Sequence, residues 1–263
     1  MCISWKKLIV KLSDLIIFVF LAVVFFTFGN SSEGEMLCKG VDIEMCDGED
    51  EGFLNKAKIE SIIKKNGMYP MSLKMKDVST YKIEKTIRKS PYVSDVNCYK
   101  THTGRLKIKI KQRIPAFMAV SSNERYFMDK SGNLMPEYGT APYVMVVTGS
   151  FSREFAKKNL VPLVSYVHND KFWNSQIEQV NVIENGGIEL IPRVGNHTVF
   201  LGSLPNDEDA EKHVSQINAF MEKKLTRLLK FYKYGLSKVG WNRYSYISVE
   251  FDNQIICKKN KNK

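Results

Sequence analysis

The chain has 263 residues, 44% of them hydrophobic, and a net charge of +11. This length fits one large or two small domains beside a short anchor. The hydrophobic fraction is ordinary for a folded core and excludes a protein with many membrane spans. The charge is uneven, because residues 31–53 carry −7 and residues 54–263 carry +16.

The apolar segment at residues 15–28 (LIIFVFLAVVFFTF) predicts a membrane anchor. Extended back to Leu8 it has 21 residues, enough to cross a bilayer. Lys6, Lys7 and Lys11 precede the apolar run at 15–28, and eight acids follow within residues 31–53, so the N-terminus is predicted to be cytoplasmic. We predict a cytoplasmic tail at 1–7, a transmembrane helix at 8–28 and a linker at 29–36. A cleaved signal peptide is the alternative, but no small-residue cleavage site follows, which favours an uncleaved anchor.

The predicted orientation limits the partners of the basic region. A field of this sign usually indicates nucleic acid, but a location outside the cytoplasm argues against it. Anionic lipid, cell-wall polymer and an acidic protein remain as possible partners of the basic region. The alternative is a solvated lysine-rich surface that binds no partner.

The cysteines do not predict a scaffold of disulfides. Cys2 is predicted to be cytoplasmic, and no C-x-x-C pair or metal-ligand spacing occurs among Cys38, Cys46, Cys98 and Cys257. In an oxidising compartment, a disulfide between Cys38 and Cys46 is an alternative. Buried free thiols are the favoured interpretation.

Residues 37–113 predict an α+β domain of order β-α-α-β-β. The strand at 37–45 is followed by a helix at 56–66, which Asn66-Gly67 ends, and by a second helix that Ser79 or Thr80 begins. The strands at 93–99 and 106–111 follow, and Leu106, Ile108 and Ile110 alternate with lysines.

This order and several residues resemble the POTRA (polypeptide-transport-associated) domain. The matching residues are Leu73, Val78, Ile83, Glu84, Ile87, Pro91, Tyr92, Val93, Val96, Leu106, Ile108, Ile110, Arg113 and Pro115. The resemblance implies a POTRA domain over residues 37–113.

Residues 114–258 predict a second α+β domain with a mainly antiparallel sheet. Its strands are expected near 125–128, 133–136, 143–147, 177–183, 188–193, 198–201, 246–251 and 254–258, and a basic tail at 259–263. Asn185-Gly186-Gly187 marks a hairpin. A helix is predicted over 154–168, with Pro162 as a kink or a new start. A long helix follows Asp207, Glu208 and Asp209, and its apolar seam is Val214, Ile217, Met221, Leu225, Leu228 and Tyr232.

The whole arrangement resembles the FtsQ (DivIB) family of bacterial cell-division proteins. One anchor and one POTRA domain precede the segment from Arg125 to Pro136, the run ending in Thr148-Gly149, and the block from Phe231 to Lys258. The resemblance implies a single-pass scaffold of the divisome at the septum, in the inner (cytoplasmic) membrane, with periplasmic domains. It also implies that FtsB and FtsL dock by strand addition to the last strand, and that the POTRA domain recruits early division proteins such as FtsK. The implied partner-binding residues are Phe251, Asn253, Gln254, Ile255, Ile256 and Cys257.

No catalytic pattern emerges from the sequence. His102, His168, His197 and His213 lie in unrelated segments without metal-ligand spacing, and no G-x-S-x-G, H-E-x-x-H or phosphate-loop motif occurs. We therefore predict no enzyme activity, cofactor, metal or small-molecule substrate. A POTRA-type envelope chaperone that binds polypeptide remains an alternative, and a membrane-tethered enzyme is a weaker one.

Overall fold

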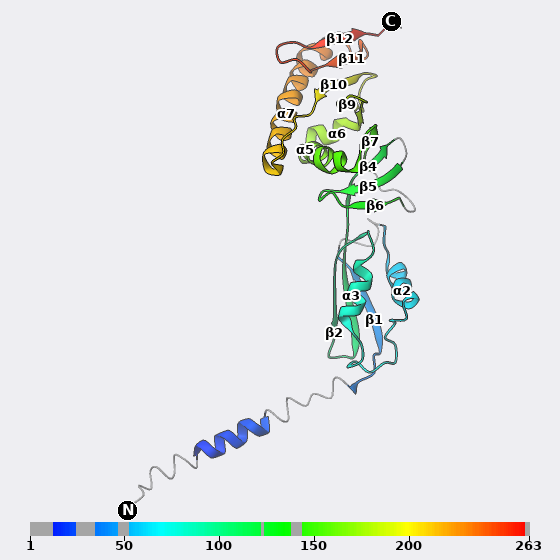
Figure 1. The fold of residues 1–263 in the computed structure, drawn as a ribbon, viewed down its shortest axis with the longest axis vertical. Helices are drawn as coiled ribbons and strands as arrows, with labels where there is room; N and C mark the ends of the chain where they lie inside the picture. The colour runs from blue at the N-terminus through cyan, green and yellow to red at the C-terminus, as the bar shows by residue number, and fades with distance from the viewer. Residues whose placement is uncertain (1–12, 25–34, 47–52, 122–123, 138–143, 261–263) are drawn as a thin grey trace, which may run out of the picture. The chain divides into compact units, whose positions relative to one another are not determined.

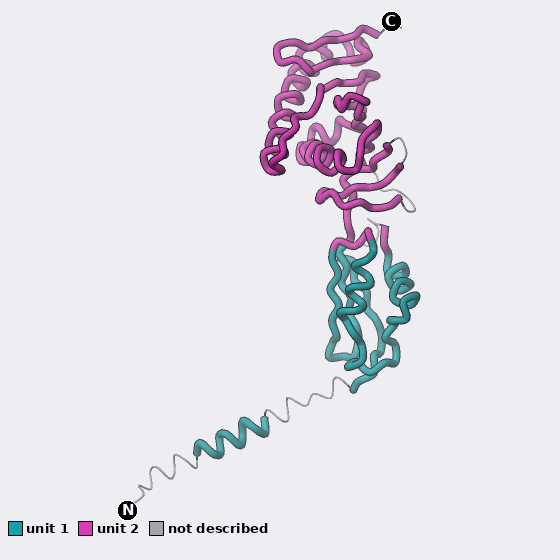
Figure 2. The backbone as a smooth tube through the Cα atoms, viewed as in Figure 1, with its two compact units in different colours: residues 1–46, 55–90, 95–111 teal, residues 47–54, 91–94, 112–263 magenta. Residues whose placement is uncertain are grey.

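The computed structural model describes residues 13–24, 35–46, 53–121, 124–137 and 144–260, and Figure 1 shows the fold. The chain divides into two compact units (Figure 2). Unit 1 comprises residues 1–46, 55–90 and 95–111, and unit 2 comprises residues 47–54, 91–94 and 112–263.

The N-terminal segment is helical at residues 13–24. Within the described ranges, no helix combines the length and the apolar character needed to cross a membrane. The predicted span at 8–28 extends at both ends beyond the described residues. The predicted tail at 1–7, most of the linker at 29–36 and the last residues of the basic tail also lie outside them.

Unit 1 has a three-stranded sheet of order β1-β3-β2 and two helices. Its elements are β1 (Gly40–Met45), α2 (Lys56–Lys65), α3 (Thr80–Arg88), β2 (Val93–Lys100) and β3 (Arg105–Gln112). β1 runs parallel to β3, in the register Val41↔Leu106 and Ile43↔Ile108. The side chains of Leu106, Ile108 and Ile110 are fully buried, as the alternation predicts. The β-α-α-β-β order is confirmed.

The two helices of unit 1 begin at side-chain caps. Asn55 accepts a hydrogen bond from the backbone N–H of Lys58 at 2.9 Å and begins α2. Ser79 accepts one from Lys82 at 3.3 Å and begins α3. These bonds satisfy N–H groups that a helix start leaves without a partner.

Unit 2 is built on a nine-stranded sheet of order β12-β11-β10-β9-β8-β7-β4-β5-β6. Its strands are β4 (Pro115–Ser121), β5 (Glu124–Asp129), β6 (Leu134–Pro136), β7 (Met145–Gly149), β8 (Ile177–Val182), β9 (Gly187–Pro192), β10 (Thr198–Ser203), β11 (Tyr244–Ser248) and β12 (Ile256–Lys259). Antiparallel pairs predominate, as predicted, but β4 pairs with β7, β7 with β8 and β10 with β11 in parallel. Parallel neighbours need a crossover, which the helices between β7 and β8 and between β10 and β11 provide.

These helices supply the core of unit 2. They are α4 (Arg153–Phe155), a π-helical turn (Ala156–Leu160), α5 (Val161–Asn169), α6 (Lys171–Gln176), α7 (Ala210–Phe231), a second π-helical turn (Tyr232–Leu236) and α8 (Ser237–Val239). Buried residues of α5 and α7, among them Val164, Met221 and Leu225, form one cluster with Val180 and Val199 of the sheet. The sheet and these two helices therefore share one hydrophobic core (Figure 1).

Two details of the predicted helices differ from the structure. The helix expected over 154–168 passes through a π-helical turn at Ala156–Leu160, and Pro162 lies in the first turn of α5, directly after it. In α7, Val214 of the predicted seam is 43% exposed, whereas His213 and Lys224 are buried. The helix thus buries a face that also contains two polar residues.

The four cysteines in the described part of the chain are free thiols. Cys38 and Cys98 are buried, Cys257 is half-buried and Cys46 is exposed. Burial raises the pKa of the Cys98 thiol to about 12. This residue is therefore a small, unreactive core side chain.

Candidate protein-binding site at the sheet edge

The last strand, β12, forms one edge of the nine-stranded sheet. It pairs with β11 in the register Ile247↔Cys257 and Ser248↔Ile256, and within the described part of the chain no strand pairs with its other side. An edge strand presents N–H and C=O groups that an incoming strand can pair with.

The opposite edge of the same sheet is blunted. β6 has only three residues and ends at Pro136, which has no N–H to donate. Its carbonyl oxygen accepts a hydrogen bond from the Tyr92 hydroxyl at 3.0 Å. A short strand with a proline is a usual protection against edge pairing. The β12 edge has four residues and no proline, and the difference between the two edges is therefore the proline of β6.

The six predicted partner-binding residues all lie on the β11–β12 hairpin. Phe251 and Ile256 are each 48% exposed, and Asn253 and Gln254 are exposed in the turn. Ile255 and Cys257 are half-buried and pack against the core that α7 covers. The strand begins at Ile256 and not at Gln254, and it continues through Lys258 to Lys259, one residue into the predicted tail.

Both faces of this hairpin segment are therefore partly apolar. Cys257 pairs with the buried Ile247 and shares its face, whereas Ile256 lies on the opposite face. Burial raises the pKa of the Cys257 thiol. An added strand next to β12 would find an apolar side chain on either side of the sheet.

Two cations of α7 hold the turn that leads into β12. Lys224 is 6% exposed, and its Nζ donates to the carbonyl oxygens of Val249, at 3.1 Å, and of Glu250. Nη1 of Arg227 donates to the carbonyl oxygens of Val249, at 3.2 Å, and of Phe251. The carbonyl groups that leave the sheet ladder after β11 thus meet donors from the helix.

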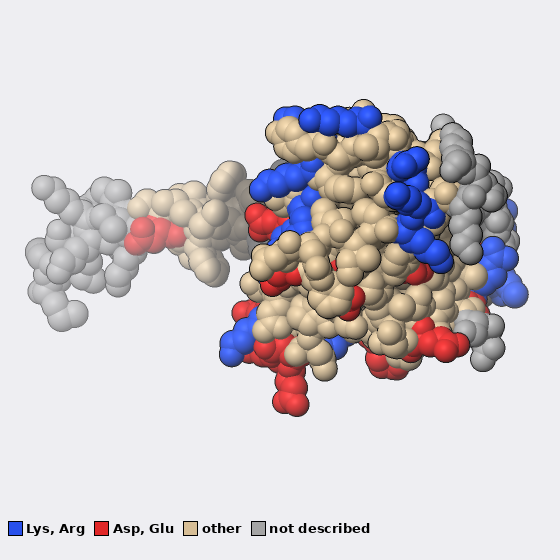
Figure 3. Space-filling view, turned by 90° about the horizontal axis from the view of Figure 1, so that it is seen from above, with Lys and Arg blue, Asp and Glu red and all other residues tan. Residues whose placement is uncertain are grey.

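The exposed end of this contact is an ion pair. Nζ of Lys223 lies 2.8 Å from Oδ2 of Asp252, and Nη2 of Arg227 lies 3.5 Å from Oδ1. The hydrogen bond from Lys223 lowers the pKa of Asp252. Burial, together with the positive charge of Arg227, lowers the pKa of Lys224. In the view of Figure 3, Lys and Arg side chains lie mostly at the top and right of the visible face, and Asp and Glu side chains lie mostly along its lower edge.

Sequence reasoning missed the role of Lys224. The predicted seam of this helix contains apolar residues only and omits Lys224. The spacing carried a signal, because Lys224 follows Met221 by three residues and so lies on the buried stripe of α7.

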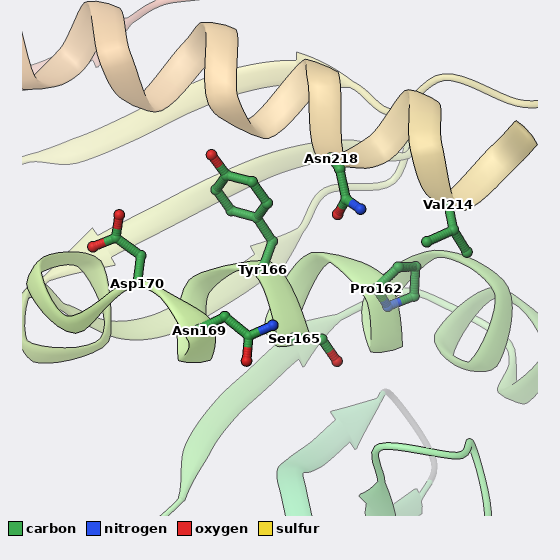
Figure 4. Close-up of a pocket in the computed structure, with 7 residues that line it drawn as sticks. All are labelled: Pro162, Ser165, Tyr166, Asn169, Asp170, Val214 and Asn218. Carbon is green, nitrogen blue, oxygen red and sulfur yellow. The ribbon is translucent and has the colours of Figure 1, made fainter. Parts of the chain in front are cut away.

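A groove of about 580 Å³ lies between α5 and α7. Tyr166 of α5 and Asn218 of α7 point into the gap between the helices (Figure 4). Asp170 also lines it, but Oδ1 of Asp170 accepts hydrogen bonds from the N–H groups of Phe172 and Trp173. The groove therefore offers no argument for acid–base catalysis.

His197 and His213 have structural partners. Nε2 of His197 lies 2.9 Å from the Tyr232 hydroxyl, and Nε2 of His213 lies 3.1 Å from Oδ1 of Asn159. Both rings are buried. No group of three or more His, Cys, Asp or Glu side chains among the described residues is placed to hold a metal ion.

The fold and its open edge define a two-domain α+β protein with a small helix-covered module followed by a larger domain that ends in an edge strand. Residues 36–111 match the POTRA-like domain, and residues 114–258 match the family FtsQ/DivIB, C-terminal related. The chain belongs to the FtsQ/DivIB family, because this second match covers more than half of it. The family supports a scaffold role in cell division. No curated protein matches the chain.

Proposed function

We propose that this chain is a single-pass membrane scaffold of the bacterial division septum that captures FtsB and FtsL through β12. The partner adds a strand to the free edge, so main-chain hydrogen bonds supply affinity and side-chain pockets supply specificity. Phe251, Asn253, Gln254, Ile255, Ile256 and Cys257 form the contact surface.

The main support for partner binding at β12 is the difference between the two edges of the unit 2 sheet. β6 is short and ends in a proline, whereas β12 exposes Ile256 and has no proline. Lys258 and Lys259 are exposed on β12, and charged residues discourage pairing with identical edges. A partner that carries acids beside its added strand is compatible with them.

The test compares the two edges directly. Ile256→Asp places a charge on the β12 edge, and Leu134→Asp places one on β6, where Leu134 is 37% exposed. Purified full-length variants are titrated with the FtsB–FtsL complex. We expect Ile256→Asp to weaken capture at least tenfold and Leu134→Asp to leave it unchanged. If both variants bind FtsB–FtsL equally well and their circular dichroism spectra are unchanged, the proposed binding at the β12 edge is contradicted.

The membrane anchor is part of the same proposal. It is supported by the apolar sequence at 8–28, its basic flank, and exposed apolar side chains at residues 15–21, among them Phe18 and Phe20. The POTRA-like unit then recruits early division proteins such as FtsK. Protease added to spheroplasts is expected to digest the residues that follow the anchor. Protection of those residues in spheroplasts, with digestion after lysis, would contradict this orientation.

A further inference from the structure

A cavity of about 470 Å³ lies at one end of the unit 2 sheet, away from the β12 edge in the strand order. It is found where the parallel strands β4, β7 and β8 begin and where the antiparallel strands β5 and β9 end. The side chains of Lys130, His168, Asn174 and Arg193 line it, together with apolar residues that include Pro115 and Ile177.

Hydrogen bonds fix the backbone from which these side chains project. Lys130 lies in the β5–β6 turn, where Oδ1 of Asp129 accepts from the N–H groups of Ser131 and Asn133 at 2.9 and 2.8 Å. The N–H of Asn174 donates to the Asp170 carbonyl at 2.9 Å, and that of Arg193 donates to the Gln176 carbonyl at 2.8 Å. The polar groups around the cavity are thus attached to rigid elements, which lowers the entropy lost on binding a ligand.

The charge around this cavity is positive. Lys130 and Arg193 are its charged residues, and among the described residues that line it none carries a carboxylate. The nearby Asp129 carboxylate is engaged by Arg113, whose Nη1 lies 2.6 Å from Oδ2. Burial lowers the pKa of His168, and the positive charge of Lys130 lowers it further. His168 and Lys130 both line the cavity.

We propose that this cavity binds a small ligand that carries a phosphate group. Arg193 and Lys130 pair with the phosphate, because a guanidinium matches its oxygen pairs and an ammonium supplies a point charge. Asn174 and the neutral imidazole of His168 donate further hydrogen bonds. The volume exceeds that of a phosphate alone and falls in the range of about 300–1,000 Å³ that holds organic ligands. Pro115 and Ile177 contact the group that the phosphate carries.

This site is independent of the proposed partner capture at β12. The shared chemistry is a phosphate ester, which either a soluble phosphomonoester or an anionic phospholipid headgroup supplies. An anion next to the imidazole stabilises its protonated form. Binding therefore raises the pKa of His168, and this rise separates occupancy of the cavity from diffuse charge attraction.

The test uses the full chain in neutral detergent micelles with labelled histidine, followed by NMR. Inorganic phosphate, glycerol 3-phosphate and acetate are titrated separately, and a further sample is prepared in nanodiscs with phosphatidylglycerol. We expect saturable binding of glycerol 3-phosphate with a rise in the pKa of His168, or the same rise in the nanodiscs alone. The first result identifies a soluble ester as the ligand, and the second identifies a lipid headgroup.

Matched variants complete the test. Lys130→Gln and Arg193→Gln are expected to weaken binding at least tenfold. Lys171→Gln, which removes an equal charge from an exposed site on α6 outside the cavity lining, is expected to leave binding unchanged. The proposal is overturned if phosphate compounds and nanodiscs leave the His168 resonance unshifted. It is equally overturned if the three variants bind alike, or if acetate binds as tightly as glycerol 3-phosphate.

Discussion

Replacement of Lys224 by methionine tests how the helix α7 holds the β11–β12 hairpin, the proposed partner-binding site. Methionine keeps much of the length and apolar contact of the lysine stem but removes its ammonium group. The Val249 carbonyl keeps its hydrogen bond from Arg227, whereas the Glu250 carbonyl loses the bond from Lys224. The main effect should therefore be local to the turn between β11 and β12.

The magnitude follows from two opposing contributions. A hydrogen bond with a charged donor contributes about 1.5–3 kcal/mol. The burial that lowers the pKa of Lys224 shows that the fold disfavours its charged form, and methionine avoids that desolvation. We expect the free energy of global unfolding to change by less than about 2 kcal/mol. The local opening free energy of the turn should fall by about 1.5–3 kcal/mol, equivalent to about 10- to 150-fold faster amide exchange.

Hydrogen exchange with mass spectrometry measures the local effect, and urea unfolding measures the global one. Lys223→Met is the matched control, because Lys223 is the preceding residue of α7 and its pair with Asp252 is exposed. An exposed pair contributes little to stability, because water and salt screen it. Exchange over residues 249–256 should accelerate strongly in Lys224→Met and little in Lys223→Met, and capture of FtsB–FtsL should fall in the same order.

Unchanged exchange over residues 249–256 in Lys224→Met would refute the reasoning, since it would show that the lysine does not hold the turn. Faster exchange with undiminished capture would refute only the link from the turn to partner binding. Rescue by Lys224→Arg, which restores a donor, would support a positioning role.

Three further predictions concern the fold. Burial opposes ionisation of Asp129, but hydrogen bonds from Arg113, Asn133 and Ser131 outweigh it and lower its pKa. The stability it contributes is complete above about pH 4, the ordinary pKa, and is lost as the pH falls through the lower folded value. Urea unfolding between pH 7 and pH 3 should therefore show a smaller acid loss in Asp129→Asn than in the parent chain. Gly149→Ala should destabilise unit 2 by at least about 2 kcal/mol in urea unfolding, because its φ is +120° and a Cβ would overlap the Val182 carbonyl. Ser79→Ala should cost α3 about 1 kcal/mol, measured by exchange of its amides, through loss of the cap.

The sequence predicted most elements because their signals are local. The alternation of Leu106, Ile108 and Ile110 identified β3, and Asn185-Gly186 identified the hairpin between β8 and β9. The parallel pairs were not predicted, because a crossover is a tertiary arrangement. The π-helical turn before Pro162 also leaves no periodic signature in the sequence.

The candidate site was predicted only in part. The resemblance implied six partner-binding residues, and all six lie on the last hairpin of the structure, where their role in binding stays a prediction. The resemblance carries no information on Lys224, and the only signal of its burial is its spacing of three residues from Met221 on the buried stripe of α7. Nor could the resemblance bring Lys130, His168 and Arg193 to one cavity, because they come from three elements well separated in the chain.

The buried lysine of α7 has a geometric explanation. A methionine or leucine at this position would also fill the space beneath the sheet, and burial of the ammonium group is unfavourable. Neither apolar residue can donate to the carbonyl groups of Val249 and Glu250, which point away from the ladder after β11. Without these donors we expect the two carbonyl groups to turn toward water, which would displace the following strand β12. We infer that Lys224 and Arg227 serve orientation more than stability, because they fix the inner side of the hairpin and leave its outer edge open to a partner strand.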